Sequence, residues 1–446
     1  MTPVGQRVDL AEEARRTLAA TRVALQLALR DKPGPSIWLQ EARRAWRLAS
    51  FRTRAWLADR ASGDPYLETT RLFCVPTSSL RHRAQLPYGY SPTKHPGAVV
   101  PGDWDLEGST MEEWPCWVEF REALRGERQW CETAWFNSLM SKAKGEDNAW
   151  RRRVFEAAAE RRIRDFECLY DSMCKYGCLP QHEIAGKRGP GYRPYDVDDI
   201  SVGVGRTGEL LLCQGGHRVE VARALGIKAV PVWIGLRHSE WWAFRTRVVA
   251  YAQAHGGKVP EQLCHPDLET IPFSFDCSGV LTLISTALSG EAGAVVDAAP
   301  GWGSLLHGLE QLGFSAVGLS ADPGERMFLE RLRDANARSF RVIDDPCAVD
   351  AVCERCAAML LLRGADRRLA AADERERVVE LLRRVRPRHV FLDCSNGYGE
   401  ACGGRAADCP SPAVRLCAEA AGLQNVEILP GDGATLLYHL HTPTVA

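Results

Sequence analysis

From residue 273 to the last residue, short apolar runs alternate with glycine-containing turns and with stretches of helical periodicity. The runs that are typical of strands lie at residues 294–297, 313–320, 339–343, 357–362, 389–394, 422–427 and 435–440. The intervening stretches at 304–312, 373–385 and 412–421 are typical of helices. Strands that alternate with helices indicate a doubly wound parallel sheet, so we predict an α/β domain over residues 273–446.

The part before residue 273 follows a different pattern. Residues 165–245 combine two helical stretches with three short apolar runs and a tight turn at 206–209, which predicts a small α+β unit. We expect this domain to cover residues 70–250, with a helical insertion near 100–160, and residues 246–272 to connect it to the next domain. Residues 1–69 are predicted to be a helical lead-in, interrupted by Pro33-Gly34-Pro35, which cannot continue a helix.

Composition excludes several classes of protein. The chain has 446 residues, 45% hydrophobic and 25% charged, which is the ordinary globular mixture and leaves room for two or three domains. Its net charge of −1 gives no global attraction to nucleic acid or to an anionic membrane. No apolar run approaches the ~18 residues of a membrane span. We therefore expect no membrane association, and nucleic acid is not expected as a partner.

The expected location follows from the first residues and the cysteines. Charged residues interrupt the N-terminal segment before an apolar stretch forms, so we expect no signal peptide. The 16 cysteines are then expected to be reduced thiols in a cytoplasmic protein. Arginine outnumbers lysine by 48 to 8, which indicates a GC-rich bacterial genome and not a function.

The clearest motif lies where the first strand of the α/β domain ends. Asp297 closes the apolar run, and Gly301 and Gly303 lie in the turn before a helix. Glycine lets the backbone approach a ligand closely, and a helix N-terminus offers free N–H groups. The spacing resembles the first motif of class I S-adenosylmethionine-dependent methyltransferases, D-x-x-x-G-x-G. The resemblance implies a Rossmann-like methyltransferase sheet that closes with an antiparallel pair, and S-adenosylmethionine as cofactor.

The same resemblance implies further cofactor-binding positions. In that family the glycine turn wraps the amino-acid and ribose part of the cofactor, an acid after the second strand holds the ribose hydroxyls, and an acid after the third strand lies beside the adenine. Ser320, with Asp322 two residues on, takes the second position here, which departs from the family pattern. Asp344 and Asp345 take the third.

The end of the predicted fifth strand and the residues after it contain three candidates for a general base: Asp393, Tyr398 and Glu400. Structural roles are the alternative for each of them. Methyl transfer depends on in-line approach of the nucleophile more than on an acid or a base. The chain has no Asn/Asp-Pro-Pro-aromatic signature, so methylation of amino groups in nucleic acid is not indicated.

A second motif lies in the middle of the chain, where Gly215, Gly216, His217 and Arg218 begin a predicted helix. Free N–H groups, the helix dipole and an arginine together favour a phosphate. With the following strand at residues 229–234, the motif resembles the ParB/sulfiredoxin-like superfamily, which implies nucleotide binding. Gly216 stands where sulfiredoxins carry their catalytic cysteine, so that chemistry is not expected. The alternative is a glycine turn with a purely structural role, next to a histidine whose hydrogen bonds are satisfied within the protein.

Two clusters of metal-ligating residue types do not have the paired Cys-x2–4-Cys units of zinc sites. They are Cys168, Cys174, Cys178 and His182, and Cys347, Cys353 and Cys356. At helical spacing such cysteines are usually small buried residues, so no metal site is expected. The chain also contains no Walker loop, Gly-x-Ser-x-Gly or His-Glu-x-x-His motif.

We therefore expect an S-adenosylmethionine-dependent methyltransferase acting on a small-molecule or sugar-type acceptor. The ParB-like module would bind a phosphate or nucleotide moiety. The alternative hypothesis is nucleotide-dependent phosphotransfer or hydrolysis by that module, with Mg²⁺, beside a methyltransferase-like domain that has lost its chemistry.

Overall fold

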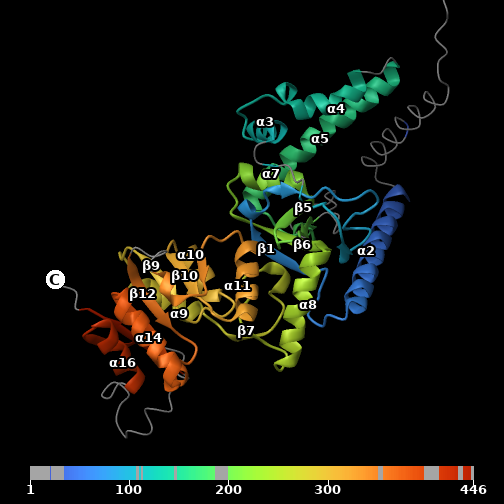
Figure 1. Ribbon diagram of the computed structural model, residues 1–446. Coiled ribbons are helices and arrows are strands. Elements are labelled where there is room, and N and C mark those ends of the chain that lie inside the picture. Colours follow the sequence, from blue (N-terminus) through green and yellow to red (C-terminus); the bar gives the residue numbers. More distant parts are fainter. Residues whose placement is uncertain are drawn as a thin grey trace, which may run out of the picture. The chain divides into compact units, whose positions relative to one another are not determined.

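The computed structural model describes residues 21, 35–106, 110–111, 114–144, 148–185, 199–349, 355–395, 411–429 and 435–442. The chain forms two compact units, residues 1–243 and 244–446 (Figure 1). Residues 255–272, which the sequence suggested as part of a connection, contribute a short strand and a 3-10 turn to the second unit. Most of the predicted lead-in at residues 1–34 lies outside the described residues.

The first unit is built on a six-stranded mixed sheet with the order β1-β6-β4-β5-β2, and β3 pairs with β6. Its strands are β1 (Leu72–Pro76), β2 (His82–Arg83), β3 (Ala98–Val100), β4 (Ile200–Val204), β5 (Leu210–Gln214) and β6 (Ala229–His238). Its helices are α2 (Pro35–Ser62), α3 (Pro115–Leu124), α4 (Ala134–Lys144), α5 (Ala149–Tyr176), α6 (Gln181–Ala185) and α7 (Gly216–Ala224), and α8 (Ser239–Ala254) begins at its last residues. Helices α3, α4 and α5 form the helical insertion and pack on one another and against α7 (Figure 1).

The Gly102-Asp103-Trp104-Asp105 segment packs against the hairpin between β4 and β5. The buried indole of Trp104 lies over Gly203, where a Cβ would be 2.9 Å from the ring, and its Nε1 donates to the carbonyl of Val100 at 3.0 Å. At the turn, the Arg206 side chain donates to both carboxylate oxygens of Asp105. Burial raises the pKa of Asp105, but the hydrogen bonds from Arg206 outweigh it and leave that pKa below its ordinary value.

The second unit has a seven-stranded sheet with the order β11-β10-β9-β12-β13-β15-β14. The strands are β9 (Ala294–Asp297), β10 (Ser315–Leu319), β11 (Arg341–Ile343), β12 (Cys356–Leu361), β13 (His389–Ser395), β14 (Asn425–Leu429) and β15 (Thr435–His441). The first five are parallel, and β15 runs antiparallel to both β13 and β14. This confirms the Rossmann-like α/β sheet predicted for the C-terminal half.

Helices cover both faces of this sheet, and the strands alternate their side chains between two cores. Val296, Met359 and Leu392 pack on the face of α14 (Ala372–Val385) and α16 (Pro412–Ala421). Their chain neighbours Val295 and Phe391 pack on the face of α9 (Ser278–Ala287) and α10 (Ser304–Gln311). A sheet buried on both faces needs such continuous apolar runs, which is why its strands could be predicted from sequence.

The strand order fixes where a ligand can approach. From β9 the chain proceeds through β10 to β11 on one side, and then returns to β12 and β13 on the other. Ligands of open α/β sheets bind outside the carboxyl ends of the strands at such a reversal. The turn between β9 and α10 lies there.

The remaining elements of the unit are β7 (Val259–Glu261), β8 (Phe273–Phe275), α11 (Pro323–Ala335), α13 (Ala365–Ala370) and the 3-10 turns at Pro266–Leu268 and Pro346–Ala348.

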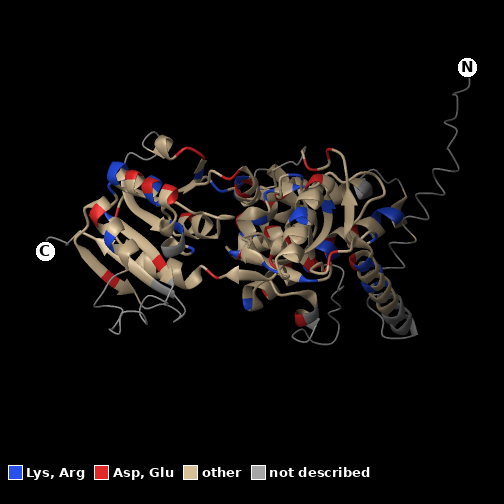
Figure 2. Cartoon of the chain, turned by 60° about the horizontal axis from the view of Figure 1, so that its bottom comes forward, with Lys and Arg blue, Asp and Glu red and all other residues tan. Residues whose placement is uncertain are grey.

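Charged side chains of both signs are scattered over the two units (Figure 2). This agrees with the near-zero net charge of the chain. Within the described residues, no helix combines the length and the hydropathy that a membrane span requires.

Candidate functional site

The turn after β9 has a backbone conformation that favours glycine at two positions. Gly301 has φ 56° and Gly303 has φ 96°, both in the left-handed region, and Gly303 is the N-cap of α10. A Cβ on Gly303 would lie 2.4 Å from Leu329 Cδ1, and one on Gly301 would lie 1.5 Å from Arg363 Nη1. The two glycines of the predicted motif therefore let the chain pack closely against its neighbours as well as turn.

The N–H groups at the start of α10 hold a carboxylate of the chain itself. Glu261, the last residue of β7, accepts hydrogen bonds from the backbone N–H of Trp302, Gly303 (3.0 Å) and Ser304 (3.1 Å), and from the Ser304 hydroxyl. The guanidinium of Arg363 completes the arrangement, with Nη2 2.5 Å from Glu261 Oε2. Glu261 is 1% exposed and Arg363 is 20% exposed, so the pair is sheltered from water.

This arrangement shows what the turn can bind. The first N–H groups of a helix have no partner within the helix, and the dipole favours negative charge at this end. Here they bind a carboxylate whose charge is balanced by a cation. Burial raises the pKa of Glu261, and Arg363 and the hydrogen-bond donors oppose that rise. Neither residue could be predicted from the sequence, because nothing in the short segments around Glu261 and Arg363 points to the glycine turn.

Asp297 is the last residue of β9, directly before the turn, and is fully buried. Its Oδ1 accepts from the backbone N–H of Ala299 at 3.0 Å, while Oδ2 has no hydrogen-bond partner among the described residues. Burial raises the pKa of Asp297, and the nearby Arg363 guanidinium opposes the rise. A buried carboxylate oxygen without a partner is costly, and a ligand with a hydroxyl or ammonium group would satisfy it.

After β10, the predicted Ser320 lies beside an acid that is not part of the sequence motif. The Ser320 hydroxyl donates to Glu325 Oε2 at 2.9 Å, and Glu325 is in the first turn of α11. Asp322 is the N-cap of α11 and accepts from the N–H groups of Gly324 and Glu325. The carboxylate at this strand end therefore comes from Glu325, five residues beyond Ser320. The sequence signal is the Asp-Pro-Gly-Glu helix start.

Asp344 and Asp345 follow β11, which neighbours β10. Asp344 is 64% exposed and forms an ion pair with Arg326 at 2.7 Å. The side-chain hydrogen bond from Arg326 holds the pKa of Asp344 below its ordinary value. Asp345 caps the 3-10 turn at Pro346–Ala348 through the N–H of Cys347. Both residues lie at the carboxyl edge of the sheet, where the sequence placed them, and both already have partners.

The candidate base Asp393 lies near the end of β13. Its carboxylate accepts hydrogen bonds from the backbone N–H groups of Arg363, Gly364 and Ala365, at 2.8 to 3.0 Å. It thereby anchors the start of α13 and positions the backbone that carries the Arg363 side chain. Tyr398 and Glu400 lie outside the described residues.

In the first unit, the predicted phosphate motif begins α7. Gly215 is its N-cap with φ 89°, where a Cβ would lie 2.9 Å from Ile200 Cα, and Gly216 is the first helical residue. The Arg218 side chain does not face solvent: it is 7% exposed, forms an ion pair with Asp199 at 3.0 Å and donates to the carbonyl of Leu179 at 2.5 Å. Arg218 thus ties α7 to the segment before β4.

His217 lies among aromatic rings from the helical insertion. Its ring stacks on Phe166 with centroids 4.5 Å apart, and it meets Trp117 and Trp135 edge-on at 5.3 and 5.9 Å. Its Nε2 is buried and has no hydrogen-bond partner among the described residues. Burial, reinforced by nearby arginines, lowers the pKa of His217 to about 4. The ring is therefore neutral at pH 7.

This burial predicts a pH-dependent stability. The unfolded chain takes up a proton at His217 at the ordinary pKa, 6.5, whereas the folded chain does so only at about 4. Between these values the unfolded state binds more protons, so the free energy of unfolding falls as the pH is lowered, by up to about 1.4 kcal/mol per pH unit. Urea denaturation at pH 7, 6 and 5 is expected to show a smaller loss in His217→Phe than in wild type. An exposed control, His82→Asn, should keep the wild-type slope, and equal slopes in all three proteins would contradict a buried neutral His217.

No family model and no curated protein matches this sequence. Among solved structures, the chain is similar to the bifunctional kinase-methyltransferase WbdD, with 16% identity and a TM-score of 0.32 over 44% of this chain and 46% of that one. It is also similar to the methyltransferase domain of bacterial CtHen1, with 16% identity and a TM-score of 0.28 over 36% of this chain and 97% of that one. A third similar structure is a TehB-like SAM-dependent methyltransferase from Corynebacterium glutamicum, with 16% identity and a TM-score of 0.27 over 46% of this chain and 98% of that one. The chain spans about half the length of the WbdD chain, and values this low assign no function to it.

Proposed function

We propose that residues 244–446 form a domain that binds S-adenosylmethionine and transfers its methyl group. One observation carries this proposal: the amides of Trp302, Gly303 and Ser304 hold a buried carboxylate that is paired with a guanidinium. The amino-acid end of S-adenosylmethionine carries a carboxylate and an ammonium group, which is the same combination of charges. The parallel sheet closed by antiparallel β15 supports the proposal, because it is the sheet that the sequence resemblance implies.

Several groups of the second unit fit such a cofactor. The α10 amides would hold its carboxylate. Asp297, whose Oδ2 has no hydrogen-bond partner among the described residues, ends β9 directly before the same turn. The Ser320–Glu325 pair follows β10, where the family carries the residue that binds the ribose hydroxyls. When bound, the cofactor supplies an electrophilic methyl group. Glu261 and Arg363 occupy the turn in this structure, so the pair must leave before a cofactor enters.

The chain's own contribution to methyl transfer is mainly positioning. Asp393 orders the backbone at 363–365 through hydrogen bonds from three N–H groups, and this backbone carries the arginine that covers the turn. An in-line approach of the acceptor can supply most of the acceleration without a dedicated base. A small-molecule or sugar-type acceptor remains a prediction. So does the binding of a phosphate or nucleotide, with Mg²⁺, by a ParB-like first unit.

Ligand-induced stabilisation tests the proposal. We expect S-adenosylmethionine and S-adenosylhomocysteine to raise the melting temperature of the full chain, since a ligand at 100 times its Kd stabilises the folded state by about 2.7 kcal/mol. Asp297→Ala should abolish this shift, while Asp334→Ala, which removes a half-exposed carboxylate of the same unit, should retain it. ATP, CTP and GTP with Mg²⁺ serve as comparison ligands. A shift with a nucleotide alone would contradict the proposal and favour nucleotide chemistry in the first unit.

A further inference from the structure

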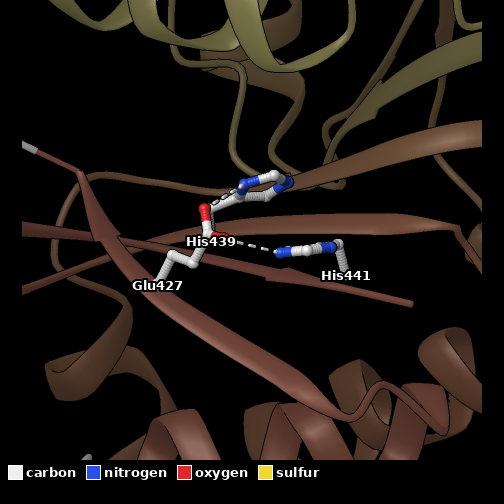
Figure 3. A group of neighbouring side chains, drawn as sticks. All are labelled: Glu427, His439 and His441. Atoms are coloured by element: carbon white, nitrogen blue, oxygen red, sulfur yellow. Dashed lines mark ion pairs between the residues drawn. The ribbon is translucent and has the colours of Figure 1, made fainter. Parts of the chain in front are cut away.

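At the antiparallel end of the second sheet, Glu427, His439 and His441 lie close together (Figure 3). Glu427 on β14 lies directly opposite His439 on β15, and His441 follows two residues later on the same strand. Residues two apart on a strand point to the same face, and directly opposed residues share a face. His389, the first residue of β13, is the register partner of His441. Three strands therefore contribute to one cluster.

The distances within this cluster suit a metal ion. His441 Nε2 lies 3.2 Å from one carboxylate oxygen of Glu427, and His439 Nδ1 lies 3.8 Å from the other. One ligand atom from each residue can be chosen so that all three lie within 4.8 Å of one another. Zn²⁺ with bonds of about 2.0–2.2 Å in tetrahedral geometry separates its ligand atoms by roughly 3.3–3.5 Å. A small inward movement would place the three ligand atoms around one ion.

A second observation points to a missing partner. His441 Nε2 is buried, and no hydrogen bond to it is formed among the described residues, although the Glu427 carboxylate lies close by. A metal ion would coordinate this nitrogen together with the neighbouring carboxylate. The Glu427 side chain is 57% exposed, so an ion can enter from solvent.

The surroundings also resemble the outer shell of a metal site. His439 uses its other ring nitrogen, Nε2, in a hydrogen bond to His389 Nδ1 at 2.9 Å. His389 Nε2 in turn lies 3.7 Å from Glu291 Oε1. Ligating histidines are typically fixed in this way by a hydrogen bond on the non-ligating nitrogen, which sets the ring orientation and the tautomer. The chain of contacts leaves His439 Nδ1 facing Glu427.

We propose that Glu427, His439 and His441 bind a Zn²⁺ ion, with the fourth position open to water. Two imidazoles and one carboxylate suit zinc, and such a three-ligand set leaves one position free. His389 starts β13, whereas Asp393 lies near its other end beside the cofactor turn. The zinc site is therefore at the opposite end of the strand from the proposed cofactor site. The ion would tie the edge strand β14 to β15 independently of methyl transfer.

Titration of chelator-treated full-length chain with Zn²⁺, followed by calorimetry, tests this site. We expect one ion per chain, and an at least hundredfold loss of affinity in both His441→Asn and Glu427→Gln. His389→Asn should weaken binding about 10- to 100-fold, because it removes a hydrogen-bonding partner of a ligand and not the ligand itself. The matched controls Glu419→Gln and His255→Asn change exposed residues of the same unit and should bind like wild type.

The spectrum of bound Co²⁺ distinguishes metal binding at this site from metal binding by the cysteines. Co²⁺ held by nitrogen and oxygen ligands shows weak visible bands without the intense thiolate charge-transfer absorption of cysteine sites. Equal metal binding in wild type, His441→Asn and Glu427→Gln would overturn the proposal, as would a thiolate spectrum. Glu427 is exposed, so Glu427→Gln keeps the test valid if a histidine variant does not fold. S-adenosylhomocysteine binding should be unchanged in Glu427→Gln, which separates this site from the proposed cofactor site.

Discussion

Glu261→Gln is expected to raise the affinity of the full chain for S-adenosylhomocysteine by tenfold or more. The carboxylate of Glu261 accepts from three backbone N–H groups and the Ser304 hydroxyl, and it pairs with Arg363. Hydrogen bonds to charged groups are worth about 1.5–3 kcal/mol against about 0.5–1.5 for neutral ones. A neutral amide therefore competes less well for the same donors, and a difference of about 1.4 kcal/mol is tenfold in affinity.

Calorimetry on the wild type and the variant measures this effect directly. Glu269→Gln, an exposed glutamate of the same unit, serves as the matched control and should bind like wild type. A lower affinity in Glu261→Gln would mean that Glu261 helps to hold the ligand, for example through the ligand's ammonium group. That result would contradict the role of Glu261 as an internal occupant of the turn.

Arg218→Ala is expected to lower the free energy of unfolding by about 3–5 kcal/mol, the usual cost of removing one partner of a buried ion pair. Asp199 would be left 8% exposed without its cation, and the carbonyl of Leu179 would lose its donor. Urea denaturation of the full chain, followed by the fluorescence of the tryptophans in the first unit, measures the change. Arg164→Ala, an exposed substitution in the same unit, should stay within about 0.5 kcal/mol of wild type.

The same variant separates two roles for the Gly215–Arg218 motif. A structural role predicts the loss of stability whether or not a nucleotide is present. A phosphate-binding side chain predicts near-normal stability with loss of nucleotide binding. A change of less than about 1 kcal/mol would therefore contradict the buried pair with Asp199.

The second sheet could be predicted because most of its parallel strands are short apolar runs, whereas β14 and β15 are interrupted by Glu427 and His439. Val295 and Val296 are both fully buried, one on each face, so burial on both sides is visible in sequence as a run. The glycine turn could be predicted for a related reason: left-handed φ at Gly301 and Gly303 restricts the residue type. Backbone requirements of this kind restrict the residue type at a position and can therefore be recognised in the local sequence.

The partners of these elements could not be predicted, because they come from distant segments. Glu261 reaches the turn from about 40 residues upstream, and Arg363 reaches it from about 60 residues downstream. The sequence predicts a phosphate site at His217 and Arg218, and only the packing of α5 and of the segment before β4 shows the partners of these two side chains. The zinc cluster is likewise formed by strand register, with its residues 2 to 14 apart on β14 and β15.

A crystal structure of the full chain grown with S-adenosylhomocysteine tests the central claim most directly. We expect the carboxylate of the ligand on the amides of Trp302, Gly303 and Ser304, with Glu261 and Arg363 displaced from the turn. A complex in which Glu261 still occupies these amides, with the ligand bound elsewhere or not at all, would contradict the assignment of this turn as the cofactor site.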